Sequence, residues 1–98
     1  YTKDDWLRIQ RGWADLMRRF IEAFEAGVPA TSQPAMDLAE EHRALITEHF
    51  YECTYDIHVG LAEMYLADDR FRAHYDDQRP GLAQYVHDAI EANAVSRA

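Results

Sequence analysis

The chain has 98 residues, of which 48% are hydrophobic and 12% aromatic, a composition typical of one globular domain and not of a disordered segment. Its formal net charge of −8 repels phosphate groups, so we expect this chain to bind neither nucleic acid nor a membrane directly. A single cysteine excludes an internal disulfide and fits a reducing cytoplasm, and no apolar run has the length of a membrane span.

The first helix is predicted from its caps and its apolar stripe. Thr2 is a suitable N-cap with Asp5 three residues later, as in a capping box, and Gly27 is a natural stop, which gives a helix from about Thr2 to Ala26. We expect Trp13 and Phe20 to lie in the core and Trp6 to line a ligand cleft. The stripe follows a spacing of three and four residues and consists of Trp6, Ile9, Trp13, Leu16, Met17, Phe20 and Phe24.

Four further helices are predicted after the "VPATSQP" turn. Their expected positions are from Ser32, with Pro34 in the first turn, to about Tyr51; from Thr54, as N-cap, to near Asp68; within "DDRFRAHYDDQ"; and from Pro80 onward. The last helix should bury Leu82, Tyr85, Val86, Ala89 and Ile90. No segment alternates with period two, so the fold class is all-α with about five helices and no sheet. We expect residues 1–98 to form a single domain and, because the chain begins at Tyr1, to be the ordered core of a longer protein.

A metal site is an available but weak interpretation of the second helix. His42, His49 and Cys53 share one stripe if the helix reaches that far, but Leu38 and Ile46 lie on it too. At 1.5 Å per residue the three side chains would be about 10 Å and about 16 Å apart along the axis, too far for one ion. We favour histidines at a buried boundary, bonded to neighbouring helices, and expect no metal and no other cofactor.

Cys53 and His58 do not predict an enzyme. A thiol with a histidine base also needs an orienting third group and an oxyanion pocket, and Asp56 points away from both on a helix. A lone cysteine among apolar residues is usually a small, inert core side chain. The carboxylates are scattered along solvated faces, with no matched acid and base. We therefore expect no catalysis.

Gly60 is unusual because it lies in the middle of a predicted helix, where glycine costs about 1 kcal/mol against alanine. It either lets a neighbouring helix approach closely or opens space for a ligand. From spacing alone, close helix packing is the favoured explanation.

Four segments in order, "YTKDDWLRIQ", "AMDLAEEHR", "HFYECTYDIHVGLAEMYLADDRF" and "PGLAQYVHDAIEANAV", resemble the TipAS antibiotic-recognition domain. This is the drug-binding C-terminal half of TipA-type transcriptional regulators of the MerR class. The resemblance covers nearly the whole chain. It implies a globin-like, all-α fold without haem, whose apolar interhelical cleft captures thiopeptide antibiotics such as thiostrepton. It also implies a parent regulator that dimerises and binds DNA through segments outside this sequence, or a stand-alone resistance protein that sequesters the drug.

The resemblance also implies a site. The family has two cysteines seven residues apart in this region, the first matching Cys53 and the second, which bonds covalently to the drug, matching Gly60. The capturing thiol is therefore absent, and binding should be non-covalent. The expected cleft residues are Trp6, Tyr51, Asp56, Ile57, Gly60, Glu63 and Met64.

Two other functions stay open from the residues alone. The five histidines are compatible with a helical metal-binding or haem-binding domain, and the apolar stripes are compatible with a module that binds a partner helix. Metal analysis and absorbance would identify the first. Size-exclusion chromatography with and without a thiopeptide would identify the second.

Overall fold

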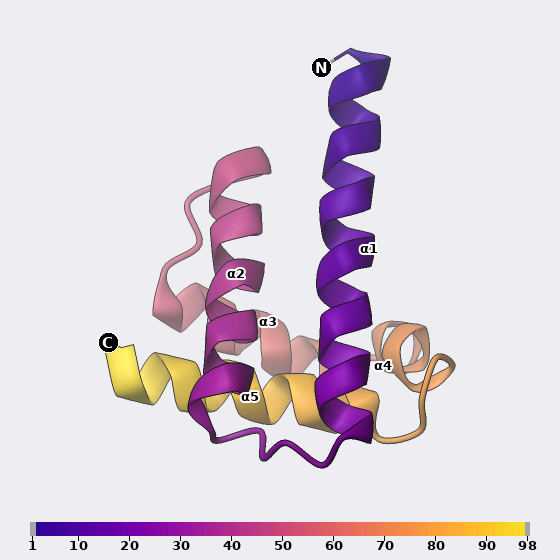
Figure 1. The fold of residues 1–98 in the computed structure, drawn as a ribbon. Helices are drawn as coiled ribbons and strands as arrows, with labels where there is room; N and C mark the ends of the chain where they lie inside the picture. Colours follow the sequence, from indigo (N-terminus) through magenta and orange to yellow (C-terminus); the bar gives the residue numbers. More distant parts are fainter. Residues whose placement is uncertain (1, 98) are drawn as a thin grey trace.

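In the computed structural model, which describes residues 2–97, the chain forms five helices and no strand within that range (Figure 1). The prediction of an all-α fold is confirmed. The second helix ends at His49, two residues earlier than expected, because Phe50 leaves the helical region with φ −125° and ψ −66°. The helices are α1 (Lys3–Glu25), α2 (Gln33–His49), α3 (Tyr55–Ala67), α4 (Asp69–Asp76) and α5 (Leu82–Arg97).

The predicted caps at Thr2, Thr54 and Gly27 are present, whereas Ser32, also expected to cap its helix, makes no capping bond and its hydroxyl donates to the Pro29 carbonyl instead. Thr2 and Asp5 form the reciprocal capping box of α1, and the Thr54 side chain accepts a hydrogen bond from the Ile57 amide at 3.2 Å. Gly27 adopts φ +76°, and the amide of the next residue donates to the Ala23 carbonyl at 3.0 Å, the closing bond of a Schellman motif. Local sequence chemistry therefore determines where these helices begin and end.

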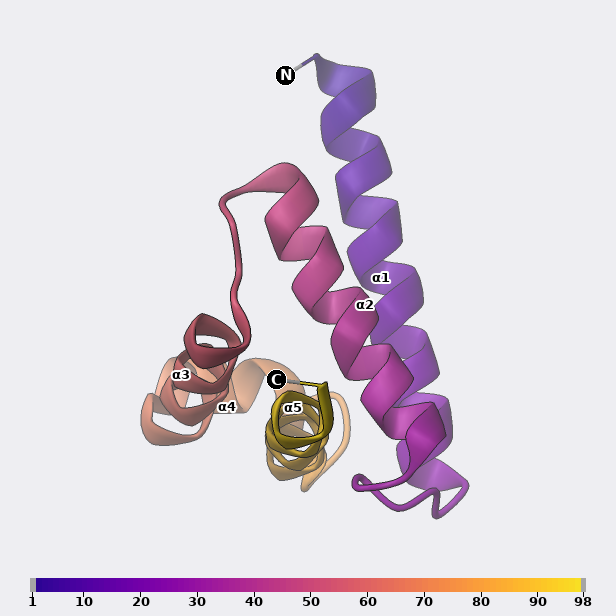
Figure 2. The ribbon, with the colours of Figure 1, turned by 90° about the vertical axis from the view of Figure 1, so that its left-hand side faces the viewer.

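The helices are arranged as an antiparallel pair crossed by a third helix. α1 and α2 run side by side, and α5 lies across their lower ends with α3 and α4 grouped beside it (Figures 1 and 2). The Arg19 guanidinium joins the pair by donating to both oxygens of Glu41, at 2.6 Å and 3.0 Å. The first turns of α1 extend beyond the end of α2 in both views.

The core is centred on α5. Leu82, Val86, Ala89 and Ile90 are at most 1% exposed, and Tyr85 is also buried, so the predicted stripe of the last helix is confirmed. α1 contributes Leu16 and Phe20, α2 contributes Ala35, Leu38 and Ala39, α3 contributes Ala62, and α4 contributes Tyr75. The prediction for Phe20 is correct. The prediction that Trp13 belongs to the core is wrong, because its side chain is only half-buried.

A polar network fixes the connection between α2 and α3. Arg43 donates to the Cys53 carbonyl at 2.8 Å, pairs with Glu40 at 2.5 Å and lies 4.3 Å above the Tyr55 ring. Glu40 also accepts from Asn93 of α5 at 3.0 Å. These hydrogen bonds, those from Arg43 first, lower the pKa of Glu40 to about 2. The segment 50–54 is thereby attached to α2, and α2 is attached to α5.

Candidate ligand-binding groove

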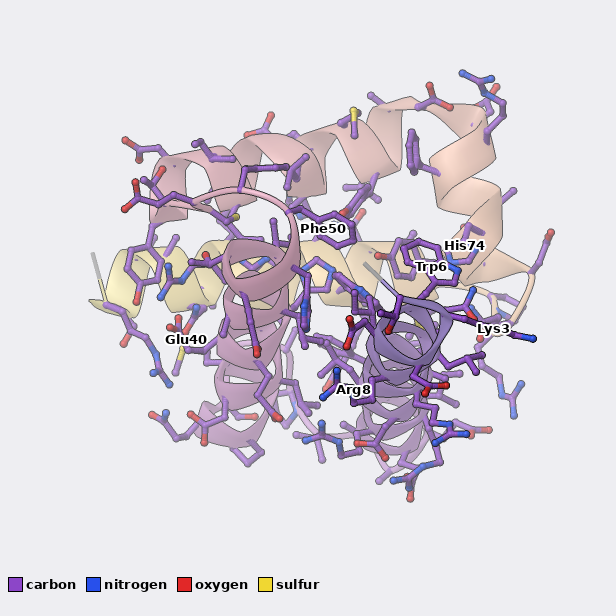
Figure 3. The ribbon with its side chains drawn as sticks, turned by 90° about the horizontal axis from the view of Figure 1, so that it is seen from above. Lys3, Trp6, Arg8, Glu40, Phe50 and His74 are labelled. Carbon is purple, nitrogen blue, oxygen red and sulfur yellow. The ribbon has the colours of Figure 1, made fainter. Side chains whose placement is uncertain are left out.

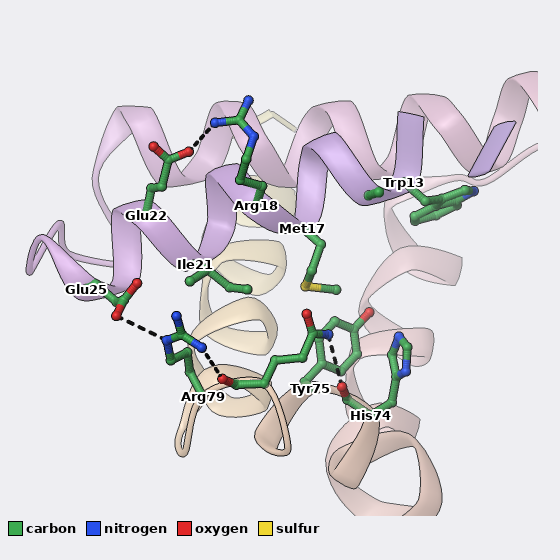
Figure 4. A pocket seen from close by; sticks show the side chains of 11 residues that line it. Trp13, Met17, Arg18, Ile21, Glu22, Glu25, His74, Tyr75 and Arg79 are labelled. Atoms are coloured by element: carbon green, nitrogen blue, oxygen red, sulfur yellow. Dashed lines mark hydrogen bonds and ion pairs between the residues drawn. The ribbon is translucent and has the colours of Figure 1, made fainter. Parts of the chain in front are cut away.

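A groove of about 680 Å³ separates α1 from α4 and from the residues that follow α4 (Figure 4). Its apolar lining comes mainly from α1, where Trp13, Met17 and Ile21 recur every four residues and so share one edge of the helix. Tyr75 of α4 contributes the facing aromatic surface. An apolar concave surface with a few polar groups at its edge is the usual form of a small-molecule site.

Polar side chains border this groove. Arg79 donates to Glu25 at 3.1 Å, which links the segment after α4 to the end of α1, and Arg18 pairs with Glu22 on α1. Gln78 donates to the His74 carbonyl at 3.1 Å. The charged groups are paired with one another, so the groove offers an apolar lining and little uncompensated charge.

A continuous run of aromatic rings leads from the groove into the molecule. Trp13 contacts His42 with ring centroids 5.0 Å apart, and His42 contacts Tyr65 at 6.2 Å. Tyr65 then contacts Tyr75 at 5.4 Å, which returns the run to the groove. Phe50, Phe71 and His74 extend it at its ends. Burial, followed by the nearby Tyr65, raises the pKa of Tyr75, so its phenol stays protonated at neutral pH.

His42 and His58 form a buried pair within this run. Nδ1 of His42 lies 2.8 Å from Nε2 of His58, which confirms for His42 the prediction of a buried histidine bonded to a neighbouring helix. Burial lowers the pKa of His42 to about 3, with a further contribution from His58. Burial also lowers the pKa of His58 to about 4, Arg43 lowering it further and Glu40 opposing the shift. Both rings are therefore neutral at pH 7.

The histidine pair predicts a loss of stability in mild acid. Each buried imidazole has a folded-state pKa below the unfolded value of about 6.5, so the unfolded state takes up more protons as pH falls. Stability is fully present above pH 6.5 and should decline below it by up to about 1.4 kcal/mol per pH unit for each histidine. Urea denaturation at pH 7, 6 and 5 measures this decline. A free energy of unfolding that stays constant from pH 7 to pH 5 would contradict the neutral pair.

The seven residues predicted from the resemblance are all exposed, and none of them lines the α1–α4 groove. Trp6, 49% exposed, lies in the projecting first turns of α1, and Figure 3 shows it from above together with Phe50. Tyr51, 48% exposed, follows α2. The other five predicted residues belong to α3. At about 100° per residue they share a face roughly opposite the buried His58 and Ala62. They are Asp56, Ile57, Gly60, Glu63 and Met64.

Gly60 does not serve close helix packing. A Cβ atom built on it would meet no neighbouring atom within 4 Å, and the residue is exposed. The packing explanation favoured from spacing is therefore wrong for residues 2–97, because none of their helices lies against the Gly60 face of α3. The space beside Gly60 is open, as the alternative explanation requires.

Cys53 is not placed as a nucleophile. It is 0% exposed, burial raises the pKa of its thiol, and its Sγ atom approaches the Thr54 carbonyl at 3.8 Å. His58 is bonded to His42 instead. Residues 2–97 contain no group of three or more histidine, cysteine or acidic side chains that could hold a metal ion. No helix in the same range is long and apolar enough to cross a membrane.

Sequence reasoning did not assign Met17, Ile21, His74 and Tyr75 to the site. A signal was present in α1, where the apolar stripe is wider than one packing face needs. Its inner residues, Ile9, Leu16 and Phe20, are buried, whereas the edge with Trp13 and Met17 is only half-buried. The matching surface of α4 had no such signal, since His74 and Tyr75 are separated from α1 by more than 45 residues.

Five helices with an apolar groove beside the core are typical of helical ligand-recognition domains. The family model of the TipAS antibiotic-recognition domain matches residues 1–93, and the chain belongs to this family. The chain is 52% identical over 95 residues to the HTH-type transcriptional activator TipA of Streptomyces coelicolor. It is 33% identical over 91 residues to the HTH-type transcriptional activator mta of Bacillus subtilis. The matched part is 97% of the chain but 38% of the length of TipA, and 92% of the chain but 34% of the length of mta.

Two solved structures have the same fold. One is TipAS in complex with nosiheptide, from a thiopeptide antibiotic multidrug resistance system of Streptomyces lividans, with a TM-score of 0.91 and 50% identity. That comparison covers 100% of this chain and 68% of the other. The second is the antibiotic-binding domain of a TipA-class multidrug resistance transcriptional regulator, with a TM-score of 0.85 and 48% identity, covering 95% of this chain and 99% of the other. The predicted fold class is confirmed.

Proposed function

We propose that residues 1–98 form a single antibiotic-recognition domain that binds thiopeptide antibiotics non-covalently. The observation that carries the proposal is the likeness to nosiheptide-bound TipAS, at 50% identity and a TM-score of 0.91 over the whole chain. In this proposal the domain binds and does not catalyse, and it acts in the cytoplasm without contacting nucleic acid or membrane itself. It serves either as the drug-recognition part of a transcriptional regulator that dimerises through other segments, or as a stand-alone resistance protein.

The α1–α4 groove is the surface that best suits an apolar macrocycle. It presents Trp13, Met17, Ile21 and Tyr75 in one concavity with its charged neighbours already paired. The seven residues predicted from the resemblance supply a second contact surface in the proposal. Of these, Trp6, Ile57 and Met64 are exposed apolar side chains that an apolar ligand would cover.

Apolar contact in the groove supplies part of the binding free energy, and the second contact surface supplies the rest. Burying about 400 Å² of apolar surface at about 25 cal/mol per Å² supplies about 10 kcal/mol before the cost of association. Subtracting about 4 kcal/mol for lost motion leaves about 6 kcal/mol, a dissociation constant of about 40 μM, so micromolar binding requires apolar contact beyond this area. No metal or redox group is needed for binding of this kind.

Titration with nosiheptide and thiostrepton tests the function. We expect micromolar or tighter binding by calorimetry, with a change in tryptophan fluorescence, because Trp13 lines the groove. The heat capacity change should be negative, since the buried surface is apolar. Absence of heat and of any fluorescence change at concentrations well above micromolar, for both antibiotics, would refute the proposal.

A matched pair of variants locates the binding surface. Ala14 lines the groove, whereas Ala44 is exposed on α2 outside it, so Ala14→Trp fills the groove and Ala44→Trp adds the same ring elsewhere. Affinity should fall by tenfold or more (about 1.4 kcal/mol) in the first variant and stay unchanged in the second. Met64→Glu tests the α3 face in the same way. Equal affinities for Ala14→Trp and Ala44→Trp would remove the groove from the proposed site.

A further inference from the structure

The buried histidine pair lies one aromatic ring away from the groove. His42 and His58 are 2% and 0% exposed, and they come from α2 and α3. The Trp13 indole contacts the His42 ring edge-on, at an interplanar angle of 81°, and the same indole lines the groove. Trp13 is only half-buried, so its ring is the one part of this contact that can move toward solvent.

Each imidazole of the pair has one nitrogen without a protein partner. Nε2 of His42 and Nδ1 of His58 are buried and make no hydrogen bond among the described residues. Unpaired polar atoms of this kind are rare inside folded proteins, because burial removes their hydrogen bonds to water. The aromatic residues around His42 offer no strong acceptor or donor in exchange, since Trp13 and Tyr65 meet it with their rings.

The two unpaired nitrogens are coupled through the bond between the rings. A neutral imidazole has one N–H and one lone pair, and the shared contact of 2.8 Å needs one of each. If His42 Nδ1 donates, then His42 Nε2 is an acceptor and His58 Nδ1 a donor. If His58 Nε2 donates, both roles reverse. The pair can therefore present either an acceptor or a donor at His42 Nε2.

We propose that the His42–His58 pair is a polar subsite of the binding cleft that pairs, at His42 Nε2, with one neutral hydrogen-bonding group of a bound thiopeptide. The inference rests on the proposed function. The group is an azole nitrogen or an amide, and it reaches the imidazole when the Trp13 indole turns aside. A charged group is excluded because His42 and its ring neighbours, Trp13 and Tyr65, provide no counter-ion. The tautomeric freedom of the pair lets the same subsite accept ligands with a donor or with an acceptor at this point.

Calorimetric titration with nosiheptide tests the subsite in three chains: the unmodified one, His42→Phe, and His87→Phe. His87 is a part-buried histidine of α5 that contacts Asp88 and lies outside the aromatic run, which makes it the matched control. We expect His42→Phe to bind roughly 3- to 10-fold more weakly, the worth of one hydrogen bond, and His87→Phe to bind as the unmodified chain does. Equal affinities of all three chains would overturn the subsite. This is also the result expected if His42 Nε2 bonds only to water.

Nitrogen NMR of the unmodified chain keeps the test decisive if His42→Phe fails to fold. Saturation with nosiheptide should shift the ring ¹⁵N resonances of both His42 and His58, because a bond at one ring fixes the proton in the other. Nosiheptide binding without any shift of these resonances would overturn the subsite and leave the proposed function standing. Absence of nosiheptide binding by the unmodified chain would instead refute both.

Discussion

Phe20→Ala is expected to lower the free energy of unfolding by about 3–5 kcal/mol, because it removes a fully buried ring and leaves a cavity at the centre of the helical core. Phe20 is 1% exposed and packs in the cluster built around α5. The loss would be a large part of the about 5–15 kcal/mol available to a small domain. Urea denaturation at pH 7 measures it.

Trp13→Ala is the natural comparison for this experiment. Trp13 belongs to the same helix but is half-buried and lines the groove. It should cost clearly less stability than Phe20→Ala while weakening antibiotic binding. If the two variants unfold at the same urea concentration, the indole is part of the core and the groove is not a ligand surface.

Gly60→Cys is expected to convert reversible binding into covalent capture. Thiopeptides carry dehydroalanines, which a thiolate can attack, and the position matches the capturing cysteine that the family resemblance implies. The space beside Gly60 is open and a cysteine is a better helix former than glycine, so the fold should accept the change. Intact-mass spectra after incubation with thiostrepton should show one added drug mass in the variant.

The unmodified chain supplies the first control, since Cys53 is buried with a raised thiol pKa and should form no adduct. Ala67→Cys supplies the second, because it places an exposed thiol on the same face of α3, seven residues further along. Equal labelling of Gly60→Cys and Ala67→Cys would mean that thiostrepton reacts with any exposed thiol. A Gly60→Cys variant that binds drug but gains no mass would show that Gly60 lies outside the contact surface.

The helices could be predicted because their signals are local. Thr2, Thr54 and Gly27 act on backbone groups within a few residues of themselves, and the stripe of α5 repeats within one helix. The resemblance to TipAS then predicted the fold family as well as the separate helices. The C-terminal end of α2 and the start of α5, predicted at Pro80 and found at Leu82, each differed by two residues, because helix ends depend on the path of the adjoining segment.

The groove and the histidine pair could not be predicted in this way. Both depend on how helices cross, which no spacing within a helix specifies: Trp13 faces α4, and His42 meets His58 across α2 and α3. An apolar residue at the edge of a stripe can face either the core or a cavity, and the sequence pattern is the same for both. Gly60 illustrates the same limit, because a glycine in the middle of a helix is compatible both with an open space and with close contact to another helix.

Because α1 projects beyond α2, the free energy of local opening differs between the two ends of this helix. Its second half holds the buried Leu16 and Phe20, so opening it disrupts the core, whereas its first ten residues bury Ile9 alone and should open at smaller cost. A binding partner that covers Trp6 therefore meets a segment that is already helical. Binding there costs little conformational entropy. The same contact area therefore contributes more binding free energy at this end of the molecule than it would on a loop.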